Sequence, residues 1–179
     1  MDIYQIFVKH NRPWSKPELL VFGVILLAAV VFVAALVHKR KIQRMQASAF
    51  IALVCFLGVV FASTVFTREP EMRQYELIPF WSWRKIFAKR DKELLLENLL
   101  NCILLFPAGC LFPVVAGRSI RPKAAYAIGF AFSAVIEVSQ LIFCRGLFEW
   151  DDMIHNGLGC MVGCMIVNAL VGKRKCKQH

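Results

Sequence analysis

The sequence has two long stretches that lack any charged residue. Residues 19–37 form an uncharged run of 19 residues, and residues 47–67 form one of 21. An apolar run longer than about 18 residues is typical of a membrane-spanning helix, and a soluble domain of this size could not bury two of them. Because 58% of the chain is hydrophobic and its mean hydropathy is +0.56, we expect a single-domain integral membrane protein.

Several features that define other protein classes are also missing. The seven cysteines are odd in number and lie mostly inside apolar runs, so we expect neither a disulfide framework nor a metal site. There is no H-E-x-x-H or G-x-S-x-G motif, and no cofactor is expected. The net charge of +10 does not indicate nucleic-acid binding, because the basic residues lie between apolar runs, as in membrane-surface loops. The first apolar run is too long for a cleavable signal peptide and ends in basic residues.

Apolar runs and polar connections alternate along the chain, which predicts an all-α bundle of about five membrane-spanning helices. The first two runs are expected to be scaffold. In the connection that follows, Pro79 precedes aromatic residues interleaved with basic ones, which predicts an amphipathic helix at the membrane surface. The predicted organisation is a surface segment 1–17, scaffold helices 18–67, a basic-aromatic connection 68–96, a core of three membrane helices 97–172 and a basic tail 173–179.

Two further features of the sequence concern the third run and the orientation. Pro107 has no N–H to donate to the carbonyl of Ile103, and Gly109 follows, so we expect a kinked or broken helix, with a re-entrant hairpin as the alternative.

The orientation in the membrane is predicted from the basic residues, which are equally numerous on the two sides of a five-span protein. Because short loops weigh more in setting orientation, the N-terminus is predicted outside and the C-terminus inside.

Polar side chains concentrate on one face of each of the last three runs. An ionisable group at membrane depth costs roughly 2.5 to 3.5 kcal/mol, so these faces are expected to turn toward each other inside the bundle. They consist of Glu97, Asn98, Asn101 and Ala108 in the third run, Tyr126, Ser133, Glu137, Gln140 and Cys144 in the fourth, and Asp152, Asn156, Gly159 and Gly163, with His155 at the edge, in the fifth.

Glu137 is the most informative of these residues, because it is a lone carboxylate within an apolar helix. It could form an ion pair with Arg145 or be protonated, but a functional role is favoured. Glu137, Asp152 and His155 are the candidate catalytic groups, although His155 is more typical of a core or helix-end histidine. Gly159 and Gly163 form a G-x-x-x-G pair that would let a neighbouring helix approach and bring the polar faces together.

The candidate ligand-binding residues each have a structural alternative. Asn101 and Asn156 fit interhelical hydrogen bonds as well as ligand binding. Arg145 fits an interfacial anchor or a bidentate binder of phosphate or carboxylate, and Asp151 fits a cap of the fifth helix. The candidate ligand-binding set is Asn101, Glu137, Gln140, Arg145, Asp152 and Asn156, and the candidate packing set is Pro107, Gly109, Gly159 and Gly163.

These residues carry a resemblance to a known family. E-x-x-Q at 137–140, followed by Arg145, Asp152, Asn156 and G-x-x-x-G, closely resembles the second signature of VanZ-like membrane proteins. Asn101 followed by Leu-Leu-Phe-Pro-Ala-Gly at 104–109 is similar to the family's N…F…P-x-G motif, except that Phe106 directly precedes Pro107. Leu-Ile-Pro-Phe at 77–80 resembles a short motif that precedes it. The resemblance covers about residues 76–170.

The resemblance implies a multi-pass protein of the bacterial cell membrane, associated with low-level resistance to the glycopeptide antibiotic teicoplanin. Our first hypothesis is binding or handling of an anionic envelope lipid or lipid-linked cell-wall precursor by the polar cluster. The alternatives are an intramembrane enzyme acting on a lipid phosphate or acyl group and, third, a proton-coupled transporter. The chain has no internal repeats of the kind from which many transporters are built, although a homodimer could supply a second half.

Overall fold

Five helical segments of the computed structural model are long and apolar enough to cross a membrane. The structure describes residues 13–176, with side chains described for residues 13–170. The chain is a multi-pass membrane protein with an all-α bundle, as the sequence predicts. The segments are α2 (Lys16–His38), α3 (Arg44–Phe61) with its π-helical continuation η1 (Ala62–Phe66), α5 (Lys92–Leu104) with α6 (Phe106–Ala116), α7 (Pro122–Phe143) and α8 (Trp150–Cys176).

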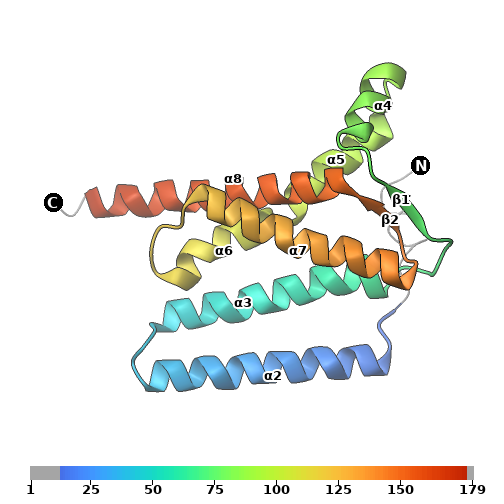
Figure 1. The fold of residues 1–179 in the computed structure, drawn as a ribbon. Coiled ribbons are helices and arrows are strands. Elements are labelled where there is room, and N and C mark those ends of the chain that lie inside the picture. Colours follow the sequence, from blue (N-terminus) through green and yellow to red (C-terminus); the bar gives the residue numbers. More distant parts are fainter. Residues whose placement is uncertain (1–12, 177–179) are drawn as a thin grey trace.

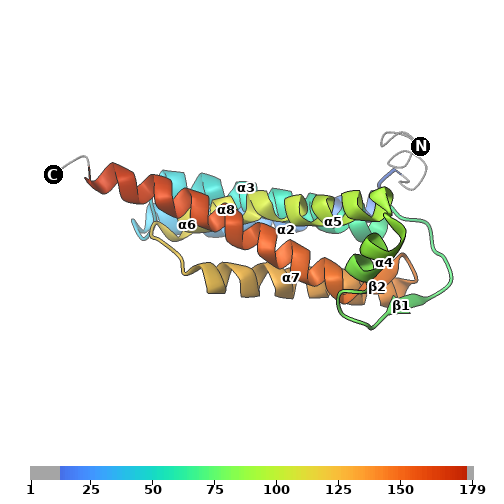
Figure 2. The ribbon, with the colours of Figure 1, turned by 90° about the horizontal axis from the view of Figure 1, so that it is seen from above.

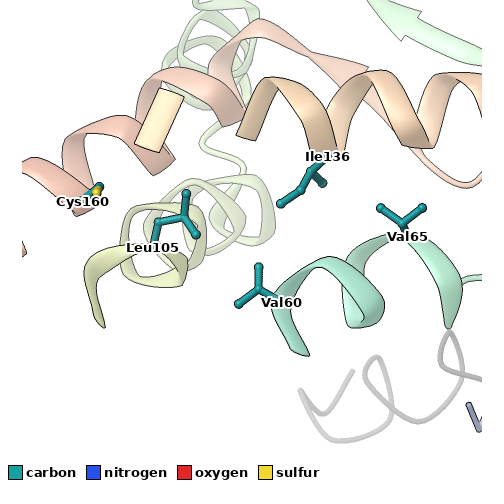
Figure 3. Packing of buried hydrophobic residues seen from close by; sticks show 5 residues of the cluster. All are labelled: Val60, Val65, Leu105, Ile136 and Cys160. Atoms are coloured by element: carbon teal, nitrogen blue, oxygen red, sulfur yellow. The ribbon is translucent and has the colours of Figure 1, made fainter. Parts of the chain in front are cut away.

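Helix α8 lies at the centre of the bundle, packed against α5, α6 and α7, while α3 packs against α6 and α2. Helix α2 therefore lies at the periphery (Figure 1). The apolar core forms where α3, η1, α5–α6, α7 and α8 meet. Figure 3 shows its buried members, Val60, Val65, Leu105, Ile136 and Cys160.

The third span is broken at Leu105, whose backbone (φ −99°, ψ 5°) ends α5 and precedes α6. Pro107 stands in the first turn of α6, where its missing N–H costs no helical hydrogen bond. The broken helix is thus confirmed. The re-entrant alternative is wrong, because α5 and α6 follow one another across the bundle in both views (Figures 1 and 2). The span also begins before residue 97, because the Asp91 carboxylate accepts a hydrogen bond from Leu94 N (3.1 Å) and caps α5.

The glycines at 159 and 163 allow α8 to approach the third span. A Cβ at Gly159 would collide with the carbonyl of Cys102, and one at Gly163 with the carbonyl of Phe106. Gly109 of α6 in turn lies against the backbone of Cys160. The close approach is as predicted, but it joins α8 to α5 and α6 and not to the fourth span.

All the shorter elements lie at one end of the bundle (Figures 1 and 2). Strands β1 (Gln74–Glu76) and β2 (Leu147–Glu149) form a parallel pair with Tyr75 opposite Phe148, and the short helix α4 (Trp81–Lys89) follows β1. The sequence analysis predicts the helix but not the strands. We call this end, with residues 67–91 and 144–149, the site end, and the opposite end, with residues 39–46 and 117–123, the basic end.

Candidate functional site

The polar faces of α5, α7 and α8 meet inside the site end of the bundle, as expected. Helix α8 begins immediately after β2, so its acidic first turn lies beside α5 and the start of α4. Glu97 is exposed and so does not turn into the bundle as expected, and the partly buried members are Asn101, Tyr126, Cys144 and Asp152. The fully buried polar residues of this cluster are Asn98, Ser133, Glu137, Gln140, Glu149, Asp151, His155 and Asn156.

Asp152 connects the third and fifth spans. Asn101 Nδ2 donates a hydrogen bond to Asp152 Oδ1 at 2.5 Å. One turn further along α8, Asn156 Nδ2 donates to Ser133 Oγ of α7 at 2.9 Å. A hydrogen bond between a side-chain amide and a polar residue of a neighbouring helix usually serves only to join the two helices. Here the two pairs lie on one face of α8 and continue toward the carboxylates at its first turn.

Glu137 is held by the backbone of the connection that leads into α8. The amide N–H of Glu149 donates to Glu137 Oε2 at 2.9 Å, and the Glu137 side chain is 3% exposed. Arg145 does not form the ion pair considered in the sequence analysis. Its Nη1 donates instead to the carbonyls of Phe66 (2.6 Å) and Val65 (3.4 Å).

Gln140 and Arg145 together fasten α7 to the end of the second span. Gln140 Nε2 donates to the carbonyl of Thr64 at 3.0 Å, within the π-helical turn η1. The carbonyls at the end of a helix lack intrahelical partners, and these two side chains supply donors for them. Their contacts in the structure are therefore helix-end contacts, and ligand binding by either residue stays a prediction.

Arg68 is a member of the site that the sequence analysis does not single out. Its side chain is exposed, and its charge acts electrostatically on Glu97, Glu137 and Asp152. A Cβ at Gly146, whose φ is +153°, would lie 2.9 Å from Arg68 Nη1, so this glycine leaves room for the guanidinium. In the sequence Arg68 only marks the end of an apolar run, which is the usual position of an interfacial anchor.

Glu149 is a buried member of the cluster at the end of β2, just before the membrane-spanning part of α8. Burial raises the pKa of this carboxyl to about 8, and the negative charges of Asp152 and Asp151 contribute to the same shift. Glu149 is therefore mostly protonated at neutral pH. A carboxylic acid that titrates near neutrality can donate or accept a proton, which is a property of many functional sites.

Asp151 holds the start of α4 and does not cap its own helix. It is fully buried, and its carboxylate accepts hydrogen bonds from Phe80 N (2.5 Å), Ser82 N (3.1 Å) and Ser82 Oγ. Asn98 Nδ2 of α5 also donates to Ser82 Oγ at 3.0 Å. Phe80 adopts a left-handed conformation (φ 60°), which turns the chain sharply into α4.

His155 provides a second contact between α8 and α4. Trp83 Nε1 donates to His155 Nε2 at 2.9 Å, and the two rings meet edge to face. The other nitrogen, His155 Nδ1, is buried without a hydrogen-bond partner within residues 13–170, and so is Asn156 Oδ1. Since Nε2 accepts a hydrogen bond, Nδ1 carries the ring proton of the neutral imidazole. His155 Nδ1–H is thus a donor, and Asn156 Oδ1 an acceptor, that could each form a further hydrogen bond, and they lie on adjacent residues of α8.

The family model described as VanZ/LLP1 matches residues 47–171, which include every described residue of the polar cluster. No curated protein and no solved structure matches the chain.

Proposed function

Because the chain belongs to the VanZ/LLP1 family, we propose that it acts in the bacterial cell membrane in tolerance of teicoplanin-type glycopeptide antibiotics. In this proposal the polar cluster binds a lipid-linked cell-wall precursor or an anionic envelope lipid. The site end faces outward, as the sequence-based orientation predicts. Bound in this way, the lipid would be shielded from an antibiotic that acts at the outer surface.

The observation that carries this proposal is the exposed guanidinium of Arg68, whose charge acts on the carboxylates of Glu97, Glu137 and Asp152 at the site end. A guanidinium that is exposed at one edge of a polar cluster can bind a phosphate group with two hydrogen bonds. Asp152, which is only partly buried, can accept hydrogen bonds from the hydroxyl and amide groups of a headgroup. A lipid-linked precursor carries both phosphate and such donors, so its headgroup matches the two kinds of side chain.

Helix α4 supports the same proposal, because it would bring the site to the depth of lipid headgroups. Lys85 Nζ lies 5.2 Å from the centre of the Trp81 ring, and Phe87 is 79% exposed. An exposed aromatic side chain beside basic residues is typical of a helix lying at the membrane surface. Its start is fastened to the first turn of α8 by Asp151, so the surface helix and the polar cluster form one unit.

The proposal is tested by teicoplanin susceptibility in a sensitive Gram-positive host. Wild type is compared with Arg68→Gln and Asp152→Asn at equal amounts of membrane-inserted protein, and lipids that copurify with each protein are identified by mass spectrometry. Arg73→Gln is the matched control, because Arg73 is an exposed arginine of the same connection. We expect wild type and the control to protect the host and to retain the precursor.

Both site variants should lose protection and retain at least tenfold less precursor, since each removes a charged contact worth about 1.5–3 kcal/mol. If all four proteins protect equally, the polar cluster serves only to pack the helices. If wild type gives no protection and retains no precursor, the proposed role is wrong.

A second candidate is an enzyme that modifies or hydrolyses a lipid phosphate or acyl group. The observation that favours it is Glu149, because a carboxyl with a pKa of about 8 is suited to general acid catalysis at neutral pH. Purified protein would be incubated with envelope lipids and the products followed by mass spectrometry. An enzyme would change a lipid pool, and Glu149→Gln would slow that change. Unchanged lipid pools would eliminate this candidate.

A further inference from the structure

Within residues 13–170, the acidic side chains lie toward the site end of the bundle. The sequence has no Asp or Glu at residues 19–68, at residues 98–136 or after residue 152. The turns at the basic end fall in these intervals (Figure 1). Within the described part of the chain, the cations of the basic end are Lys39, Arg40, Lys41, Arg44, Arg118, Arg121 and Lys123. Among the residues whose side chains the structure describes, no carboxylate lies at this end to neutralise them.

A depression of about 610 Å³ lies among some of these cations, in the turn between α2 and α3. Arg40, Lys41 and Arg44 line it, together with the amide side chain of Gln46 and the apolar side chain of Val37. Hydrophobic and cationic groups thus share one concave surface. This combination matches an amphiphilic anion better than a small inorganic one.

The shape of the depression is fixed by hydrogen bonds that do not use the cationic groups. The backbone N–H of Arg40, which has φ 52°, donates to the carbonyl of Val37 at 2.9 Å, and that of Lys41 donates to Leu36. Gln46 Oε1 accepts from Gln43 N at 2.9 Å, and Gln46 Nε2 donates to the carbonyl of Val115 in α6 at 3.2 Å. The floor is therefore fastened to two helices, while the three cationic side chains line the opening.

We propose that this depression binds the phosphate-bearing headgroup of an anionic phospholipid, with the acyl chains lying along α2. The turn joins two membrane spans and so lies at the depth of lipid headgroups. Helix α2 exposes apolar side chains, including Val30 and Val31, along which acyl chains would pack. Basic residues near a membrane surface attract anionic lipids, and the attraction grows with the number of positive charges. The site is separate from the polar cluster, which lies at the opposite end of the bundle.

The test measures phospholipid binding to the purified full chain in detergent by native mass spectrometry. Phosphatidylglycerol is compared with phosphatidylcholine of the same acyl chains, and soluble glycerol phosphate is added as a competitor. The site variant replaces Arg40, Lys41 and Arg44 together by Gln. The control replaces Arg118, Arg121 and Lys123 by Gln, which removes the same charge from the same end without touching the lining of the depression.

We expect wild type and the control to bind phosphatidylglycerol at least tenfold more tightly than phosphatidylcholine, and the site variant to lose this preference. Glycerol phosphate should compete poorly, because it has no acyl chains. The proposal is overturned if the two triple variants lose equal affinity, if wild type does not distinguish the two lipids, or if glycerol phosphate alone binds as tightly. If the site variant fails to fold, Lys41→Gln alone should still weaken phosphatidylglycerol binding, because the Lys41 side chain takes no part in the hydrogen bonds that shape the turn, whereas Arg118→Gln should leave binding unchanged. Equal binding by these two single variants would also overturn the proposal.

Discussion

Replacing Asp151 by Ala should release helix α4 from the bundle while leaving the membrane spans folded. The fully buried carboxylate accepts three hydrogen bonds, from Phe80 N, Ser82 N and Ser82 Oγ. Helix α4 has only nine residues, and an isolated helix of that length is unstable in water. Its attachment therefore depends on contacts such as these.

The size of the effect follows from the hydrogen bonds that are lost. A hydrogen bond to a charged group contributes about 1.5–3 kcal/mol, and the three share one carboxylate, so their sum is not additive. We take about 3 kcal/mol as the cost of losing the carboxylate. If opening of α4 is fast compared with cleavage, this corresponds to roughly a hundredfold increase in the open population.

Limited trypsin digestion in detergent measures this opening, because α4 contains Arg84, Lys85 and Lys89 as cleavage sites. Cleavage within α4 should become about a hundredfold faster in Asp151→Ala. Asp151→Asn retains one acceptor oxygen and should show a smaller increase, of roughly tenfold. The control is Glu69→Ala, which removes an exposed carboxylate from the same end. Cleavage of Asp151→Ala at the wild-type rate would refute the assigned role of this carboxylate.

Two further predictions concern packing and pH. Gly159→Leu should destabilise the protein by about 3 kcal/mol in thermal unfolding, because the new side chain would collide with the Cys102 backbone. The control is Gly23→Leu, where nothing lies within 4 Å of the new Cβ, and its stability should be within about 0.5 kcal/mol of wild type. Equal losses of stability in the two variants would contradict this packing. Glu149 has a folded-state pKa of about 8, raised from 4.5, so the stability that it contributes below pH 4.5 is lost as the pH rises toward about 8. Three pH units at 1.36 kcal/mol each give an upper limit of about 4 kcal/mol, which solvent screening of this carboxyl reduces to roughly 2 kcal/mol. Glu149→Gln should gain about this much over wild type between pH 5 and pH 9, and parallel pH profiles would show that the carboxyl does not titrate there.

Part of the candidate site could be predicted because each member leaves a local signal. Glu137 and Asp152 interrupt apolar runs, and a period of 3.6 residues places Asn156 on the same face as Asp152. The identities of their partners leave no such signal. Asp152 meets Asn101, whereas Glu137 meets a backbone N–H, and a backbone group is the same at every position of a sequence. The carbonyl of Phe66, to which Arg145 donates, leaves no signal in the sequence for the same reason, and ligand binding by Arg145 stays a prediction.

The sequence by itself determines the class of this protein, its five spans and the break in the third. These are local properties, because the length of an apolar run and the missing N–H of a proline act within one segment. Tertiary structure alone decides which helix the glycines of α8 face, that Asp151 caps α4, and that the exposed Arg68 lies beside the carboxylates. Each of these depends on contacts between residues far apart in the chain, which are set by how all the helices pack together.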